Sequence, residues 1–372
     1  MLRKKNLILF IVFCFFSSVI FAEDIENERH SSETEAHHTE TKFAPGKEII
    51  NHILDAHDWH ICDWGEHHIS IPLPVILLCD GKFYCFMSNK FEHGHAHYKD
   101  FALTEEGKIV HYETDGNISE SKVWDFSLTK NALAILISVV IIAVVFISVA
   151  KSSRKTGSNK APKGLQNLIE PVITYIRDEI AGKFIQKDKI DIFLPYLVTL
   201  FFFILTNNLM GLIPIFPGGA NVTGNIAITL CLAVFTYIVV TINGTKDYWK
   251  HIFNTPGVPW FLKVPIPILP IVEFIGTLTK PIVLMIRLFA NITAGHIIVL
   301  GFIFLIFILG KLSPVAGYGV APVSIIFTLF ISVLELLVAF VQAYIFTTLS
   351  SLYIGSAVTK HHHNEEKKVT NN

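Results

Sequence analysis

Ionisable side chains inside long apolar stretches are the residues of this sequence that are suited to chemistry. From residue 264 to residue 358 the chain is mostly apolar, yet it contains Glu273, Arg287, His296 and Glu335. A charge at membrane depth is costly unless it faces water, a partner group or a functional site. Carboxylic acids and imidazoles can take up and release protons, whereas a guanidinium stays charged. The set therefore predicts a functional site within a membrane.

Three of the charged residues share one face of a predicted helix. Glu273, Lys280 and Arg287 follow one another at nearly two helical turns. Asn291 lies one turn beyond Arg287 on the same face. This stripe cannot face lipid, although Lys280 also fits a side chain that reaches back to the membrane surface.

Other polar groups occupy different helix faces. His296 is placed near the side of its helix opposite Arg287, and Glu335 and Gln342 share one face of the last helix. His296 and Glu335 need a function or a partner group at membrane depth, and a buried pair that only bonds to itself is one alternative. Gln342 has the alternative role of joining helices by hydrogen bonds.

Composition indicates how these residues are positioned. The 372 residues are 51% hydrophobic and only 16% charged, more apolar than a soluble chain of this length usually is, and the net charge is -1. The basic residues form no single face, so nucleic acid is not predicted as a partner. Five apolar stretches are long enough to cross a bilayer, namely residues 131–150, 192–213, 226–242, 264–310 and 320–358.

The last two stretches are longer than one perpendicular crossing requires. At about 1.5 Å per residue the first would measure some 70 Å, against an apolar core of about 30 Å. A pair of long tilted helices is therefore predicted. The fold class is an all-α integral membrane protein with five transmembrane helices, one amphipathic surface helix and an exported polar N-terminal region.

Basic residues predict the orientation of the chain. Lys151, Arg154 and Lys155 end the first crossing and indicate the cytoplasm. Residues 164–185 alternate apolar and charged side chains at helical spacing, which predicts the amphipathic helix along the cytoplasmic surface. Residues 214–224 are expected to form an exposed turn, and the C-terminus is expected to be cytoplasmic.

The N-terminal third is expected outside the cytoplasm. Residues 1–22 have a basic start and a short apolar core, which predicts a signal peptide, with an uncleaved first span as the alternative. Residues 23–126 form the exported His-rich region, disordered before Pro45 and with a hairpin that turns at Gly107. Residues 127–372 form the transmembrane ion-channel domain.

Histidines and cysteines of the exported region have two interpretations. His57, His60, His67 and His68 are candidate metal ligands, but no repeated ligand spacing emerges and a solvated, buffering segment is the alternative. Among the cysteines at 62, 79 and 85 one disulfide is possible, whereas those at 14 and 231 are expected to pack in apolar segments. No cofactor is predicted.

Residues 281–296, Pro-Ile-Val-Leu-Met-Ile-Arg-Leu-Phe-Ala-Asn-Ile-Thr-Ala-Gly-His, resemble the signature of the ATP synthase a subunit family. The resemblance extends to Asn207-Asn-Leu-Met-Gly-Leu-Ile-Pro214, to Glu273 and to Gln342-Ala-Tyr-Ile-Phe-Thr-Thr-Leu, and so covers roughly residues 165–358. Ala290 stands where the family usually has Gly. His296 and Glu335 exchange the acid and imidazole of many bacterial members, which keeps one of each.

The resemblance implies a proton-translocating stator subunit with two half-channels, placed in the cell inner membrane and not an enzyme by itself. Its implied partners are a c-ring, b subunits, indirectly the ATPase head, and membrane lipid. Arg287 would face the c-ring. The implied translocation residues are Arg287, Glu273, His296, Glu335, Asn291 and Gln342, with Asn207 and Asn208 as further polar groups of a half-channel.

Two function classes compete with this one. A metal-ion transporter would use the exported histidines together with His296 and Glu335, but it predicts clustered ligands and inverted repeats, which the sequence does not show. A membrane-anchored binding protein needs one anchor rather than five crossings.

Overall fold

The fold was analysed in a computed structural model that describes Gly46 and residues 54–64, 67–94, 96–104, 107–112, 122–156, 161–213, 216–253 and 268–359. The predicted signal peptide and the predicted disorder before Pro45 lie outside these residues, and Gly46 is helical.

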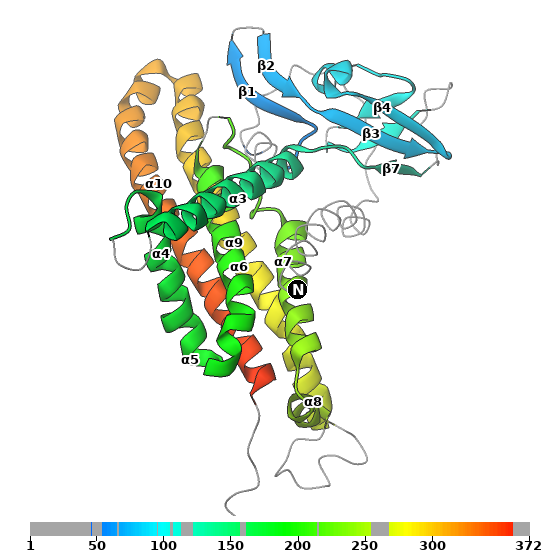
Figure 1. Ribbon diagram of the computed structural model, residues 1–372. Coiled ribbons are helices and arrows are strands. Elements are labelled where there is room, and N and C mark those ends of the chain that lie inside the picture. Colours follow the sequence, from blue (N-terminus) through cyan, green and yellow to red (C-terminus); the bar gives the residue numbers. More distant parts are fainter. Residues whose placement is uncertain are drawn as a thin grey trace, which may run out of the picture. The chain divides into compact units, whose positions relative to one another are not determined.

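The described N-terminal residues form small antiparallel sheets, which we call the β region (Figure 1). Strands β1 (Asp58–Trp64) and β2 (His67–Pro72) pair with each other. A three-stranded sheet has the order β4-β3-β7, with β3 at Pro74–Cys79, β4 at Lys82–Met87 and β7 at Val123–Asp125. Ser88–Gly94 forms the 3₁₀ helix η1. The predicted hairpin at Gly107 is confirmed by β5 (Phe101–Leu103) and β6 (Ile109–His111).

Alternating side chains of β3 build the core of the β region. Val75, Leu77 and Cys79 are buried and pack with Phe86, Phe91, Phe101 and Ile109. Asp80 and Gly81 both have positive φ, 49° and 74°, in the turn between β3 and β4. An Asp-Gly pair favours such a two-residue hairpin turn. The sequence was predicted to form only the hairpin at Gly107, whereas the described residues of this region form three sheets.

Helices make up the rest of the described chain. They are α3 (Lys130–Thr156), α4 (Leu165–Tyr175), the π-helical stretch η2 (Ile176–Ala181), α5 (Gly182–Phe184), α6 (Lys187–Leu212), α7 (Ile226–Asn243), α8 (Lys246–Phe253), α9 (Ile268–Leu312) and α10 (Pro314–Val358). Five of these, α3, α6, α7, α9 and α10, are long and apolar enough to cross a membrane. The predicted five crossings and the two long final helices, each of 45 residues, are confirmed.

The chain divides into two compact units. Unit 1 contains residues 1–141, 206–228 and 289–339, and unit 2 contains residues 142–205, 229–288 and 340–372. The long helices therefore contribute one part to each unit. Each unit is described by itself below.

One local prediction, the exposed turn at residues 214–224, was wrong in detail. Residues 220–224 are buried rather than exposed, because the turn folds back over α6, where Gly219 N donates to Met210 O at 3.1 Å. In the amphipathic helix, Leu165 and Leu168 are exposed, whereas Ile169, Ile176 and Ile180 are buried. This helix packs on the end of α10 in unit 2, where Ser351 Oγ donates to Ile180 O at 3.3 Å.

Cys79, Cys85 and Cys231 are not in disulfides. Cys79 points into the core of the β region and Cys85 is exposed, so these two do not form the predicted disulfide. Cys231 is buried, as expected for a packing residue. Cys14 lies outside the described residues, and nothing is described of the side chain of Cys62.

Candidate functional site

Polar residues of α6, α9 and α10 meet inside unit 1. Asn208 of α6 is buried; its Nδ2 donates to Ala339 O of α10 at 3.1 Å, and its Oδ1 accepts from Thr223 Oγ1 at 2.6 Å. Thr223 belongs to the buried turn between α6 and α7. Asn208 thus links three segments that are distant in sequence.

Glu335 and His296 lie against glycines of neighbouring helices in this unit. A Cβ atom added to Gly295 of α9 would overlap the Glu335 carboxyl group of α10. A Cβ atom added to Gly211 of α6 would lie 3.6 Å from His296 Nε2. The two glycines therefore make room for the two ionisable side chains.

These contacts belong to one polar cluster, because the residues that make them share helix faces. Gly211 follows Asn208 by three residues on α6, and Ala339 follows Glu335 by four on α10, so each pair shares a helix face. Both Glu335 and His296 are half-buried. We call this set the unit 1 cluster; it consists of Asn208, Gly211, Thr223, Gly295, His296 and Glu335.

Two further predicted residues of unit 1 differ in exposure. Asn207 is buried next to Asn208, whereas Asn291 of α9 is exposed. Sequence reasoning missed Thr223, because it was assigned to an exposed turn. The only local signal for it was the small, polar composition of residues 218–225, which suits a tight buried turn as well as an open one.

Arg287 belongs to unit 2 and is exposed on α9. Its neighbours Val283 and Ile286 are also exposed, at 45% and 50%, whereas Leu284 and Leu288 are buried. One side of this helix is therefore packed, and the other presents a guanidinium among apolar side chains. No ion pair of Arg287 occurs among the residues that the structure describes.

A pocket in unit 2 lies beside the first charged residues of the same helix. It is lined from α7, α8, α9 and α10, with Thr277, Lys280 and Tyr353 on its wall. Lys280 Nζ lies 5.3 Å from the centre of the Tyr353 ring, a cation–π arrangement. Thr277 Oγ1 donates to the main-chain oxygen of Glu273 at 3.0 Å, and the Glu273 side chain is half-buried.

Gln342 is buried on α10 in unit 2, 5% exposed. The structure shows no hydrogen bond between Gln342 and Arg287.

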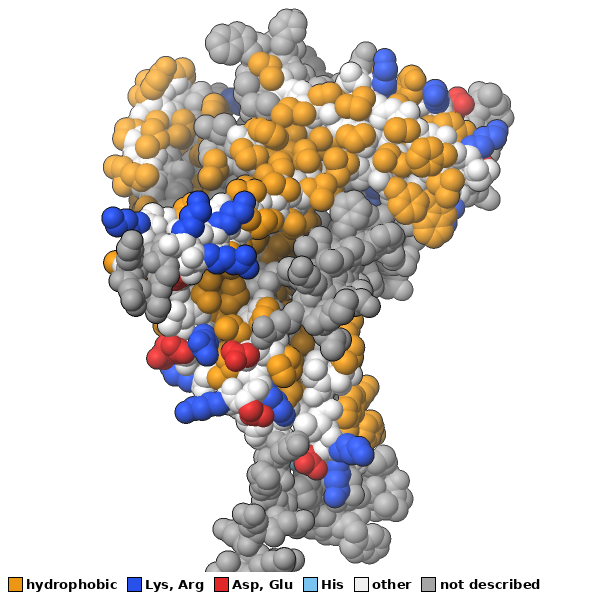
Figure 2. All heavy atoms as spheres, in the orientation of Figure 1, with side chains coloured by type: hydrophobic (Ala, Val, Ile, Leu, Met, Phe, Trp, Pro, Cys, Tyr) orange, Lys and Arg blue, Asp and Glu red, His pale blue; other side chains and the backbone are white. Residues whose placement is uncertain are grey.

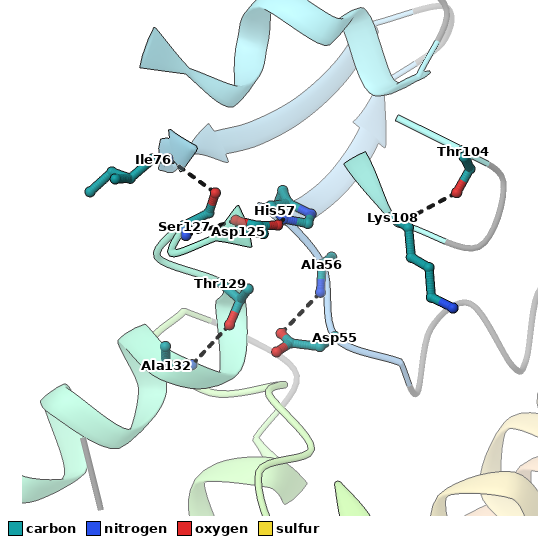
Figure 3. A network of polar contacts seen from close by, with 10 residues as sticks. All are labelled: Asp55, Ala56, His57, Ile76, Thr104, Lys108, Asp125, Ser127, Thr129 and Ala132. Carbon is teal, nitrogen blue, oxygen red and sulfur yellow. Dashed lines mark hydrogen bonds and ion pairs between the residues drawn. The ribbon is translucent and has the colours of Figure 1, made fainter. Parts of the chain in front are cut away.

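The candidate metal ligands are only partly described. His57 is buried, and its Nε2 lies 2.7 Å from Asp125 Oδ2 (Figure 3). His60, His67 and His68 belong to β1 and β2, but nothing is described of their side chains. Among the described side chains no group of three or more His, Cys, Asp or Glu residues is arranged to hold a metal ion.

The fold and these clusters define a multi-pass integral membrane protein with ionisable groups inside its long apolar helices. A family described as "ATP synthase A chain" matches residues 132–355. The chain belongs to this family. A second match, to a domain of unknown function (DUF8433), covers residues 48–126.

Curated relatives agree with the family match. The chain is 41% identical over 271 residues to ATP synthase subunit a of Chloroherpeton thalassium, which covers 70% of this chain and 77% of the relative. It is 44% identical over 241 residues to ATP synthase subunit a 2 of Chlorobaculum tepidum, covering 63% and 64%. For subunit a of Anaeromyxobacter sp. the values are 41% over 276 residues, 71% and 62%.

Proposed function

We propose that this chain is the proton-conducting stator subunit of a rotary ATP synthase. The observation that carries the proposal is the exposed Arg287 on the apolar surface of α9. Guanidinium stays charged at any physiological pH, so lipid alone cannot accommodate this side chain at membrane depth. A carboxylate on a moving partner can stabilise this charge.

That partner is a ring of c subunits, each with one carboxylic acid. A protonated acid is neutral and can face lipid while the ring turns. When it reaches Arg287, the deprotonated form is stabilised by the opposite charge and releases its proton. The same positive charge repels protons and so prevents a direct leak between the two sides of the membrane.

Protons reach and leave the ring by two separate half-channels. The unit 1 cluster supplies one, with His296 and Glu335 as relays and Asn207, Asn208 and Asn291 as groups that order water. Unit 2 supplies the other, with Glu273 beside the pocket and Gln342 as a further polar group. The offset between the half-channels forces each proton to travel with the ring.

The remaining assignments follow from this function. The N-terminal region is periplasmic, the C-terminus is cytoplasmic, and the membrane is the cell inner membrane. The chain contributes no catalytic site; the ATPase head does the ATP chemistry, and b subunits connect that head to the membrane sector. Residues 1–22 are the signal peptide, 23–126 the exported region and 127–372 the ion-channel domain.

Replacement of Arg287 tests the mechanism directly. In membrane vesicles that hold the assembled enzyme, Arg287→Ala should abolish ATP-driven proton pumping while the chain stays in the membrane. Arg177→Ala is the matched control, because it removes an exposed arginine from the amphipathic helix rather than from α9. Robust pumping by Arg287→Ala would refute the proposal.

Cross-linking tests the predicted contact with the ring. Ile286→Cys, on the exposed side of α9, should form an oxidant-induced disulfide with a cysteine placed in the c subunit. Leu288→Cys should not, because Leu288 is 1% exposed. Equal cross-linking at both positions, or at neither, would argue against this docking surface.

The alternative of a metal-ion transporter has less support. The family match covers the crossings that such a transporter would have to use. His57, one of its candidate ligands, uses one ring nitrogen for Asp125.

A further inference from the structure

The three-stranded sheet of the β region has two apolar faces. One face carries Val75, Leu77 and Phe86 into the buried core. The other face is open: Phe83 is 68% exposed and Trp124 is 45% exposed. Figure 2 shows hydrophobic side chains gathered over this sheet. An exposed apolar surface of this kind marks an interaction site.

Strand register aligns the exposed residues in rows. Leu78 pairs with Phe83 on one side and with Trp124 on the other. Two residues along, Ile76 pairs with Cys85 and accepts a hydrogen bond from Phe126 N at 2.8 Å. Paired residues point to the same side of a sheet. We call these six residues the open face; none of them is charged.

The open face is close in sequence to the first membrane crossing. Lys130, the first residue of α3, comes six residues after Trp124, and an extended chain rises about 3.3 Å per residue. Trp124 therefore lies within about 20 Å of the start of that crossing. Phe126 lies closer still, so the face is within reach of the headgroup layer of the bilayer.

Hydrogen bonds hold the β region to the beginning of α3. Lys130 N donates to Ala56 O at 2.8 Å, and Asn131 N donates to Asp55 Oδ1 at 3.0 Å. Thr129 Oγ1 accepts from Ala132 N at 3.3 Å (Figure 3). The linker is thus ordered, and the β region cannot turn freely about it.

We propose that the open face rests on the lipid bilayer, in the headgroup layer on the side where α3 begins. Tryptophan favours this layer, because its amphipathic ring lies at the level of the headgroups. Phenylalanine side chains can be buried at the boundary between the headgroups and the acyl chains. Lys122 Nζ lies 4.4 Å from the centre of the Trp124 ring, so a cation stands beside the face where lipid phosphates would be. The crossing that follows also exposes apolar side chains, since Val140 of α3 is 60% exposed. The β region in this way rests on the membrane.

A spin label on Cys85 tests the proposal in the full-length chain. Cys14 and Cys62 are replaced by serine, and the buried Cys79 and Cys231 are kept. The protein is reconstituted in vesicles of phosphatidylethanolamine and phosphatidylglycerol. Collisions of the label with oxygen, which dissolves in lipid, are compared with collisions with a water-soluble nickel chelate.

At position 85 we expect protection from the nickel chelate with oxygen collisions retained. The matched control is a label at Lys108→Cys, because Lys108 is exposed beside the β5-β6 hairpin and not on the open face. That label should collide with the nickel chelate. Replacing Trp124 and Phe126 by serine should restore nickel access at position 85.

Two results would overturn the proposal. Equal nickel access at positions 85 and 108 would show that the face is in water. Protection of the label at Cys85 from both reagents would show that protein covers the face. Dipolar broadening between labels would then show that the covering protein is a second copy of the chain. Without broadening, the covering protein would be a segment of the same chain.

Discussion

The side-chain amide of Asn208 on α6 donates a hydrogen bond to the main-chain oxygen of Ala339 on α10, one helical turn after Glu335. The same side chain accepts a hydrogen bond from Thr223. A single buried amide therefore fixes the helix that carries a candidate relay. Because all three groups are buried, loss of the amide would leave polar atoms without partners.

Asn208→Ala should destabilise unit 1 by about 1–3 kcal/mol, the usual cost of leaving a buried polar group unpaired. Proton pumping should fall with it, because Glu335 loses a fixed position. The control is Asn243→Ala, since Asn243 is exposed and its amide bonds only within its own helix. Thermal unfolding measures the loss of stability, and ATP-driven pumping measures the loss of activity. If the two variants behave alike, Asn208 does not hold Glu335 in position.

Gly295→Ala should impair pumping more than Gly301→Ala. The added methyl group at 295 would overlap the Glu335 carboxyl group, whereas at Gly301 nothing lies within 4 Å of the new atom. Overpacking of this kind costs about 1–3 kcal/mol and shifts side chains. Initial pumping rates, normalised to the amount of assembled enzyme, separate the two variants. If both pump alike, Glu335 does not occupy this position in the working enzyme.

The membrane helices could be predicted from sequence because burial in lipid requires long apolar runs, which are visible without any tertiary information. Arg287 and Glu335 were found for the same reason, since a charge in such a run is conspicuous. The contacts within the unit 1 cluster could not be predicted from sequence. Thr223 reaches Asn208 only because a turn folds back, and the space at Gly211 matters only because His296 approaches from another helix.

The β region shows a different limit of sequence reasoning. Its histidines and charges suggested a largely solvated segment, and they drew attention away from alternating residues such as Val75 and Leu77. The Asp80-Gly81 turn was a usable local signal for a hairpin. The pairing of β3 with β7 was not predictable in this way, because it joins residues more than 40 positions apart.

Exchange of the two relay residues tests their partnership. Glu335→His combined with His296→Glu should pump better than either single variant, because the double variant keeps one acid and one imidazole in the unit 1 cluster. Each single variant leaves two groups of the same kind, whose proton affinities no longer differ in the required way. The measurement compares the pumping rates of the unaltered chain, the two single variants and the double variant at equal amounts of assembled enzyme. Losses that simply add would show that the residues act independently.

The His57–Asp125 contact predicts a pH dependence of the β region. Burial alone would lower the pKa of His57, but the hydrogen bond and charge of Asp125 raise this pKa above its ordinary 6.5. Burial alone would likewise raise the pKa of Asp125, yet the bond from His57 lowers it below 3.8. Nearby Asp58 also favours the protonated imidazole, and Lys130 is the nearby cation, beside Asp55.

The sign follows from the two shifts. A raised histidine pKa stabilises the fold fully below 6.5 and ceases to do so as pH rises through the folded-state value. A lowered aspartate pKa stabilises the fold above 3.8 and ceases to do so as pH falls through the folded-state value. Burial raises the pKa of Asp55, so its ionisation weakens the fold in the same direction as the loss of the His57 charge.

The β region should therefore be most stable in mildly acidic solution and should lose stability once His57 is neutral. Amide hydrogen exchange of Phe126 and Leu128, whose N–H groups bond to β3, measures this in the full-length chain after correction for the intrinsic pH dependence of exchange. His57→Gln is the control, since its amide can still donate to Asp125 but does not titrate. Its exchange protection should vary less with pH above 6.5 than that of the unaltered chain. Identical profiles would mean that this pair does not set the stability of the β region.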